Sequence, residues 1–172
     1  MTIRPITAKD TGLFFEMMCR LDGETDFMLY EPGERREKTK DTSLLREKIE
    51  SSVTKGDLFL IAVADGGEPV GFISAERGRL NRVRHTAYIV VGLLTEYRGR
   101  GIGTEFFRRL DQWARSSGVT RLELTVECAN EAAIKLYEKS GFKIEGTRSQ
   151  SMKVNGVLAD EFYMGKIIDA GK

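Results

Sequence analysis

The chain has little of several residues that mark specialised protein classes. Its 172 residues include two cysteines, three prolines, one tryptophan and one histidine. Cys19 and Cys128 lie far apart and have neither the spacing of a disulfide framework nor that of a metal site. We therefore expect reduced thiols and no bound metal.

The sequence also lacks long apolar runs and an excess of charge of one sign. No run approaches the ~20 residues that a membrane-spanning helix needs, and the net charge is only +1 at pH 7. The N-terminus, MTIRPITAKD, has no basic region followed by an apolar stretch, so it does not resemble a secretory signal. These absences predict a cytoplasmic protein that binds neither membranes nor nucleic acid, with the arginine-rich segment 77–84 as a solvated turn.

The length suits one domain, and no repeat, low-complexity segment or linker divides the chain. The segments 2–6, 58–64, 70–76 and 86–94 are typical of strands, and the last three, joined by tight connections, predict an antiparallel meander. Helical spacing follows residue 10, with Leu13, Phe14, Met17 and Leu21 among the apolar positions. We expect a single domain over residues 1–172 that begins with a strand and a helix.

The segment 22–38 is polar and irregular, and we expect a mobile loop there. A second helix with Leu45, Ile49 and Val53 should follow it, and a third should begin at Ile102.

A further strand, RLELTVE, precedes a helix over about 130–140. Asn155-Gly156 then separates two extended stretches, which is a strong hairpin signal. The predicted order is βααβββαβαββ: an α/β (mixed α+β) fold with a mixed, mostly antiparallel sheet of about seven strands flanked by four helices.

Glycines are concentrated in TEYRGRGIGTEFF, residues 95–107, between a strand and a helix. Glycine lets backbone N–H groups converge without a Cβ in the way, and the following helix start favours negative charge. The stretch therefore predicts a phosphate-bearing ligand. It has neither the spacing nor the lysine of a P-loop. It also departs from the G-x-G-x-x-G of dinucleotide folds, which leaves a dinucleotide-binding oxidoreductase as a less favoured alternative.

The segment Arg98-Gly99-Arg100-Gly101-Ile102-Gly103 resembles the [RQ]-x-x-G-x-[GA] signature of the GNAT superfamily of acetyl-CoA-dependent N-acetyltransferases. Downstream, ECANEAAIKLYEKSGF is similar to that family's second cofactor segment, and the element order is similar over nearly the whole chain. The family often has proline before the loop, where this chain has Thr95. The resemblance implies a GNAT-like N-acetyltransferase domain with acetyl-CoA as co-substrate.

The resemblance also implies roles for individual residues in cofactor binding. The backbone of Arg98, Gly99, Arg100, Gly101, Ile102 and Gly103 would hold the pyrophosphate. The backbone of Val91 and Leu93 would contact the pantetheine arm on a strand that Gly92 bulges. Asn130 would touch the cofactor, although it is equally suited to be a helix N-cap.

Tyr137 matches the tyrosine that would protonate the departing thiolate, but its spacing also fits a core aromatic. Many relatives have a carboxylate base on the strand before the loop, and this chain has none there. The candidate base is His85, which alternation places on one strand face with Ala87 and Ile89; a surface histidine at the strand end is the alternative. Cys128 is more easily read as a small buried thiol than as an acyl carrier.

Together these features predict direct attack of a primary amine on acetyl-CoA in a ternary complex. The acceptor would be a small-molecule or peptide amine, and acids at Glu24, Asp26, Glu31 and Glu34 would favour a cationic one unless they are merely solvated. A homodimer is compatible with the resemblance. The alternative from another class is a non-catalytic acyl-CoA-binding or regulatory module, against which the retained Tyr137 argues.

Overall fold

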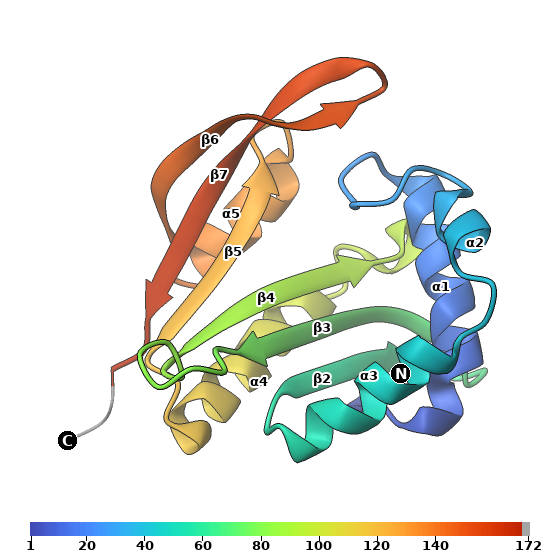
Figure 1. Ribbon diagram of the computed structural model, residues 1–172, viewed down its shortest axis with the longest axis horizontal. Helices are drawn as coiled ribbons and strands as arrows, with labels where there is room; N and C mark the ends of the chain where they lie inside the picture. The colour runs from blue at the N-terminus through green and yellow to red at the C-terminus, as the bar shows by residue number, and fades with distance from the viewer. Residues whose placement is uncertain (170–172) are drawn as a thin grey trace. The chain divides into compact units, whose positions relative to one another are not determined.

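The computed structural model describes residues 1–169, so the last three residues of the predicted domain lie outside the described part. Figure 1 shows a mixed α/β fold, whose strands and helices follow the predicted order except for one additional helix. The strands are β1 (Thr2–Pro5), β2 (Leu58–Val63), β3 (Pro69–Arg77), β4 (Thr86–Leu93), β5 (Arg121–Glu127), β6 (Lys143–Val154) and β7 (Val157–Ile167). The helices are α1 (Thr11–Glu24), α2 (Glu34–Lys38), α3 (Ser43–Thr54), α4 (Ile102–Ser117) and α5 (Glu131–Lys139), with short 3-10 helices η1 (Ala8–Asp10) and η2 (Thr95–Tyr97).

The strands confirm the predicted mixed, mostly antiparallel sheet. Their order is β1-β2-β3-β4-β5-β7-β6. The pairs β1/β2, β2/β3, β5/β7 and β6/β7 are antiparallel, whereas β4 pairs in parallel with β5 over Thr86–Tyr88 and Arg121–Glu123. The crossover between these parallel strands runs through α4, as a parallel connection requires.

The segment 22–38 differs from the predicted loop. Helix α1 continues to Glu24, and five residues of the segment form α2, so the described chain has one helix more than the four expected. The sequence of α2, ERREK, carries no apolar face and none of its residues is buried. Local pattern therefore could not reveal this helix.

The described chain folds as two compact units. Unit 1 comprises residues 1–76 and 90–106, and unit 2 comprises 77–89 and 107 onward. Strand β4 and helix α4 each contribute residues to both. The expectation of a single domain stays a prediction, and each unit is described by itself.

The core of unit 1 is built by α1, α3 and the strands β1–β3. Phe14 lies 5.4 Å, ring centroid to ring centroid, from both Phe59 of β2 and Phe72 of β3. The predicted apolar face of α1 is buried at Phe14, Met17, Met18 and Leu21, but Leu13 is 55% exposed. On α3, Ile49 is buried, whereas Val53 is 70% exposed and does not contribute to the core as predicted.

The core of unit 2 lies beneath α4, α5 and the strands β5 and β7. Phe107, Tyr137 and Phe142 form an aromatic cluster with edge-to-face contacts from Phe107 to the other two rings. Leu122 and Leu124 alternate inward from β5 and are buried. The hairpin predicted at Asn155-Gly156 is confirmed, with φ values of 49° and 82°, both in the left-handed region that a type I′ turn requires.

The carboxylate of Asp10 fixes the start of unit 1, where Thr7 and Asp10 form a capping box. Asp10 accepts hydrogen bonds from the Thr7 backbone N–H and hydroxyl, and from both terminal nitrogens of Arg4 at 2.8 and 2.7 Å. These contacts hold the pKa of the Asp10 carboxyl well below its usual range, chiefly through the bond from Arg4. The contacts stabilise the charged form and tie β1 to the entrance of α1.

We expect Asp10→Asn to lower the free energy of unfolding at neutral pH by about 1–2 kcal/mol, allowing for the partial exposure of Arg4. Because the folded pKa is lowered, the stabilisation is complete above the unfolded value of about 3.9 and is lost as pH falls through the folded one. Urea unfolding at several pH values should show wild type and variant converging in acid. A difference that stays constant down to pH ~2 would show that ionisation of Asp10 contributes nothing.

Candidate active site

The glycine-rich loop of unit 1 has the backbone conformation that its composition predicts. Gly99 and Gly101 have φ values of +71° and +81°, in the left-handed region that side chains rarely adopt. The Gly101 carbonyl accepts the Glu105 N–H at 3.0 Å, so it closes the first turn of α4. Because the first N–H groups of a helix have no partner within it, this turn presents donors to an anion at the end of the loop.

The arginines of the loop have separate local contacts. Nε of Arg98 donates to the carbonyl of Leu93 at 3.1 Å, which ties the end of β4 to the loop. The guanidinium of Arg100 lies over the ring of Tyr97, 5.1 Å from its centroid. Both arginines are exposed. Their side chains can therefore add positive charge beside the backbone N–H groups of the loop without occupying the space in front of them.

Strand β4 leads into the loop and carries the predicted pantetheine contacts. Val91 and Leu93 are half-buried, and Gly92 between them is buried. A Cβ at Gly92 would lie 2.5 Å from Cδ2 of Leu21 and 2.9 Å from Cε1 of Phe72. Glycine is thus required here by close packing under α1, while the bulge expected at this position stays a prediction.

The loop conformation can be tested by changing one glycine. Gly101→Ala is expected to raise the Kd for acetyl-CoA by about 5- to 30-fold, because a left-handed non-glycine residue costs about 1–2 kcal/mol and the loop would relax away from its cradle geometry. Isothermal titration calorimetry measures the change.

Gly118 is the matched control, because it follows the other end of α4 and has a φ of +72°. Apart from the adjoining residues of the chain, no described atom lies within 4 Å of the Cβ position at either glycine. Gly118→Ala should lose similar stability and keep the Kd. Equal Kd values for the two variants and wild type would refute a binding role for the loop conformation.

In unit 2, Asn130 is the N-cap of α5. Its Oδ1 accepts the Ala133 N–H at 3.2 Å. The structure therefore confirms the capping alternative, and the cofactor contact stays a prediction.

Tyr137 is 8% exposed and packs in the aromatic cluster with Phe107 and Phe142. The core-aromatic alternative is therefore confirmed for its ring. Burial raises the pKa of its hydroxyl above the ordinary phenol value, and nearby Tyr88 adds to the shift. The phenol is thus kept protonated at neutral pH, the form that a general acid needs.

His85 lies in the exposed turn that precedes β4, one residue before the strand begins. Its backbone carbonyl accepts the N–H groups of Thr120 and Arg121 at 2.9 and 3.1 Å. Its surroundings are those of a histidine at a strand end. The base role therefore rests on the sequence argument alone.

The strands of unit 2 carry two polar networks that the sequence pattern did not predict. Tyr163 donates to Glu123 at 2.6 Å, and Arg121 also binds Glu123 at 2.5 Å. Burial and the bond to Glu123 raise the pKa of Tyr163 to about 12.

In the second network, Glu161 of β7 is 8% exposed and accepts from Arg148 at 2.9 Å and from Ser151 at 2.8 Å. Its cross-strand partner on β5 is Glu127, which is 7% exposed. The alternation in RLELTVE, which puts Arg121, Glu123 and Glu127 on one face, was the signal available.

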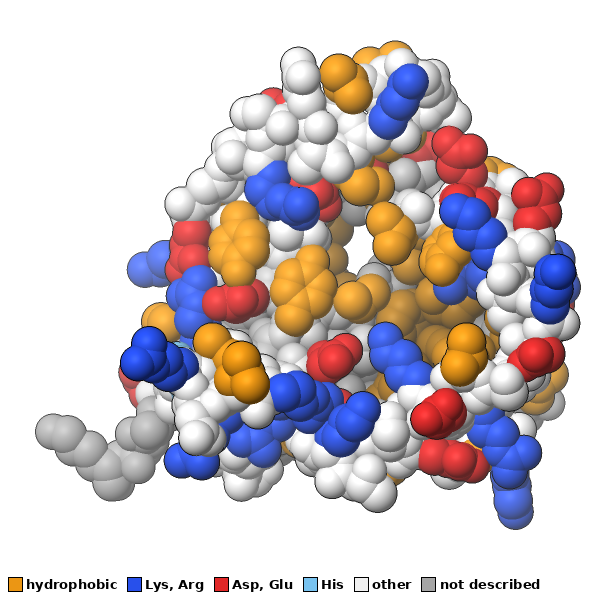
Figure 2. Space-filling model, viewed as in Figure 1, with side chains coloured by type: hydrophobic (Ala, Val, Ile, Leu, Met, Phe, Trp, Pro, Cys, Tyr) orange, Lys and Arg blue, Asp and Glu red, His pale blue; other side chains and the backbone are white. Residues whose placement is uncertain are grey.

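The acids expected to attract a cationic acceptor are partly used in internal contacts. Glu24 binds Arg20 and the backbone of Thr95, and Glu34 binds Lys38 and the backbone N–H of Glu31. These two carboxylates therefore have structural roles. Figure 2 shows acidic and basic side chains interspersed over the visible face.

Cys19 and Cys128 are both free thiols. Burial raises the pKa of Cys128, so its nucleophilic thiolate form is disfavoured. Among residues 1–169, no group of three or more His, Cys, Asp and Glu side chains could hold a metal ion. No helix in this described part is long and apolar enough to cross a membrane.

Comparisons with known proteins agree with the glycine loop and the strand order. The model of the acetyltransferase (GNAT) family matches residues 17–142. L-amino acid N-acetyltransferase AaaT of Escherichia coli is 34% identical over 112 residues, which cover 63% of this chain and 67% of that relative. N-alpha-acetyltransferase RimI of Mycobacterium tuberculosis is 37% identical over 106 residues, which cover 60% and 63% of the two chains. The chain thus spans about two thirds of the length of these curated relatives.

Among solved structures, the acetyltransferase of GNAT family from Streptococcus pneumoniae superposes with a TM-score of 0.89 at 26% identity, covering 98% of this chain and 99% of that one. YncA of Salmonella typhimurium, solved with its cofactor acetyl-CoA, has a TM-score of 0.85 at 22% identity, covering 100% and 96%. The family match spans most of this chain, and the fold likeness spans nearly all of it. The chain therefore belongs to the acetyltransferase (GNAT) family and is an N-acetyltransferase.

Proposed function

We propose that this protein transfers the acetyl group of acetyl-CoA to the α-amino group of an L-amino acid or of a peptide N-terminus. The observation that carries the acetyl-CoA part is the loop of Gly99 and Gly101, with its two left-handed residues at the start of α4. The α-amine part is supported by the names of the relatives AaaT, an L-amino acid N-acetyltransferase, and RimI, an N-alpha-acetyltransferase.

In the proposed complex, the backbone of residues 98–103 binds the pyrophosphate, with Arg98 and Arg100 adding charge at its edge. Backbone N–H groups bind phosphate through charge-assisted hydrogen bonds worth about 1.5–3 kcal/mol each. The backbone of Val91 and Leu93 binds the pantetheine arm, and the side chain of Asn130 adds a polar contact. These roles follow from the family motif, on positions that match it in this sequence.

The proposed reaction is direct attack. The neutral amine nitrogen forms a bond to the thioester carbonyl carbon, and the tetrahedral intermediate then breaks its carbon–sulfur bond to release CoA. Tyr137 supplies the proton that the departing thiolate takes up, and the proton that the nitrogen of the tetrahedral intermediate gives up restores the phenol. The burial that raises the pKa of the phenol would raise the basicity of a thiolate held beside it as well, so transfer between the two is not disfavoured by burial.

The proton lost by the attacking ammonium goes to a base, for which His85 is the proposed residue. An exposed imidazole can accept a proton through a ring nitrogen. His85→Gln should lower kcat at neutral pH by about 10-fold or more, because it removes the proposed proton acceptor. An unchanged kcat would remove His85 from the mechanism. A cytoplasmic location and a homodimer also belong to this proposal.

An acceptor screen tests the proposed function. The purified protein is incubated with acetyl-CoA and, in separate reactions, with free L-amino acids, tetrapeptides with free N-termini, Nα-blocked lysine and a polyamine, and products are identified by mass spectrometry. Acetylation of α-amines in either of the first two arms is expected, and the productive arm identifies the source. Acetylation of only the ε-amine or polyamine would refute the α-amine proposal. No acetylation in any arm would favour a non-catalytic acyl-CoA-binding module.

A further inference from the structure

The last turn of α1 contacts two loops that are far apart in the sequence. Residues 20–24 form this turn, which lies within unit 1 together with both loops. One loop, residues 25–42, contains α2 and most of the segment 22–38, where the GNAT resemblance places part of the acceptor site; it is called the acceptor loop below. The other, residues 95–103, contains η2 and the glycines proposed to bind the cofactor.

Glu24 and Arg20 connect this turn to η2. Oε2 of Glu24 accepts the backbone N–H of Thr95 at 2.8 Å, and its Oε1 accepts Nε of Arg20 at 2.8 Å. Arg20 then donates to Glu96 at 2.7 Å. Burial favours the neutral form of Glu24, but the bonds from Thr95 and Arg20 prevail and leave its pKa below the ordinary value. The Arg98 N–H donates to the Thr95 carbonyl at 3.1 Å, so the held 3-10 turn leads directly into the glycine loop.

The same turn holds the other loop through Asp22. This side chain is 1% exposed, and it accepts Nε and NH2 of Arg35 at 2.5 and 2.9 Å. The guanidinium of Arg35 also lies over the ring of Tyr30, 4.3 Å from its centroid. Helix α2 and the segment before it are thereby fixed to the turn.

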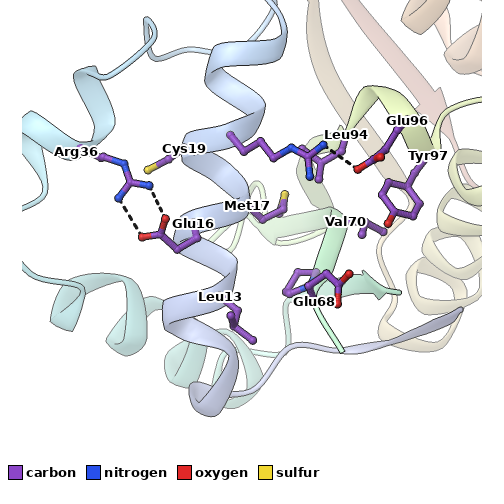
Figure 3. Close-up of a pocket in the computed structure, with 12 residues that line it drawn as sticks. Leu13, Glu16, Met17, Cys19, Arg36, Glu68, Val70, Leu94, Glu96 and Tyr97 are labelled. Atoms are coloured by element: carbon purple, nitrogen blue, oxygen red, sulfur yellow. Dashed lines mark hydrogen bonds and ion pairs between the residues drawn. The ribbon is translucent and has the colours of Figure 1, made fainter. Parts of the chain in front are cut away.

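The turn itself is anchored in the core and open to solvent on one side. Leu21 is 1% exposed and lies against Gly92 of β4. Figure 3 shows a cavity beside α1 with Glu96, Tyr97 and Leu94 on one side and Arg36 on the other. The ion pair between Arg20 and Glu96 lies on the wall of this cavity of about 430 Å³. Both side chains of this ion pair are 52% exposed, so the connection lies at the surface while Leu21 anchors the turn in the core.

We propose that the last turn of α1 couples the two loops, with Glu24 as a positioning residue for the cofactor loop and Asp22 as its counterpart for the acceptor loop. The inference rests on the proposed function, since it assigns acetyl-CoA to the loop at residues 98–103. Occupation of that loop stabilises η2, and the shared turn transmits the stabilisation to α2. Coupling of this kind is reciprocal for binding free energies, so an ordered acceptor loop also favours cofactor binding.

Two measurements with acetyl-CoA as the probe test the coupling. Glu24→Ala should raise the Kd for acetyl-CoA by about 5- to 10-fold, whereas Glu24→Gln, which keeps an oxygen for the Thr95 N–H, should recover most of the affinity. In hydrogen–deuterium exchange, saturating acetyl-CoA should slow exchange in the peptide that covers α2 in wild type, and this protection should be lost in Glu24→Ala.

Glu50→Ala is the matched control, because Glu50 forms an exposed i,i+4 ion pair with Arg46 on α3. It should leave both readouts unchanged. If Glu24 has only a structural role, Glu24→Ala will lower the stability of the protein but leave the ligand-induced protection of α2 intact. That result would overturn the inference and leave the proposed function standing. If wild type itself does not bind acetyl-CoA, both are overturned.

Discussion

Tyr137→Phe is expected to lower kcat by about 100-fold or more and to leave the Kd for acetyl-CoA unchanged. Positioned general acids typically contribute about 10²- to 10⁴-fold. The substitution removes only the hydroxyl, and the ring keeps its contacts with Phe107 and Phe142. Stopped-flow or steady-state release of CoA measures kcat, and calorimetry measures the Kd.

Tyr163→Phe is the control for this result. The Tyr163 hydroxyl donates its hydrogen bond to Glu123, so its proton is not available to a leaving thiolate. Its removal should change kcat by no more than a few-fold. A Tyr137→Phe enzyme with wild-type kcat would show that Tyr137 serves only as a core aromatic.

Arg35→Ala should produce the largest loss of stability, a fall of about 3–5 kcal/mol in the free energy of unfolding. Asp22 is almost fully buried, and Arg35 is the cation that the structure pairs with it. Without Arg35, the carboxylate must stay buried and uncompensated, take up a proton, or break the packing around α1. In a domain of this size the midpoint of thermal unfolding should fall by about 6–20 °C.

The neighbouring Arg36 supplies the comparison. Arg36 pairs with Glu16, and both side chains are more than half exposed, at 54% and 56%. Arg36→Ala should leave the midpoint of thermal unfolding nearly unchanged, because exposed ion pairs contribute little. Equal midpoints for the Arg35 and Arg36 variants, measured by differential scanning calorimetry, would show that the Asp22–Arg35 pair does not fix α2.

The features predicted well from the sequence are those set by neighbouring residues. Asn155-Gly156 determines its turn because both residues accept positive φ, and Gly99 and Gly101 determine the loop for the same reason. Helix α4 begins at Ile102 as predicted, and its buried residues Phe106, Leu110 and Ala114 lie at helical spacing.

The features that were missed depend on contacts between distant residues. The ion pair between Arg35 and Asp22 holds helix α2 in place, and nothing in the local sequence ERREK predicts that ion pair. The bond from the Thr95 N–H to Glu24 joins residues 71 positions apart. Val53 has helical spacing but stays largely exposed, because burial depends on which elements pack against α3 and not on the spacing alone.

In the candidate site, too, local features were predictable and contacts between distant residues were not. The glycine loop and the N-cap at Asn130 were predictable because their chemistry is local. The pairing of Glu123 with Tyr163 depends on the register of β5 with β7, which the sequence does not specify.

Initial rates of CoA release, measured while acetyl-CoA and the best α-amine acceptor are varied together, test direct acetyl transfer most directly. Direct attack requires both substrates on the enzyme at once, and the raised pKa of Cys128 disfavours an acyl-cysteine. Double-reciprocal plots should therefore give intersecting lines, and no acetyl group should remain on the protein after incubation with acetyl-CoA alone. Parallel lines together with a stable acetylated Cys128 would contradict direct transfer.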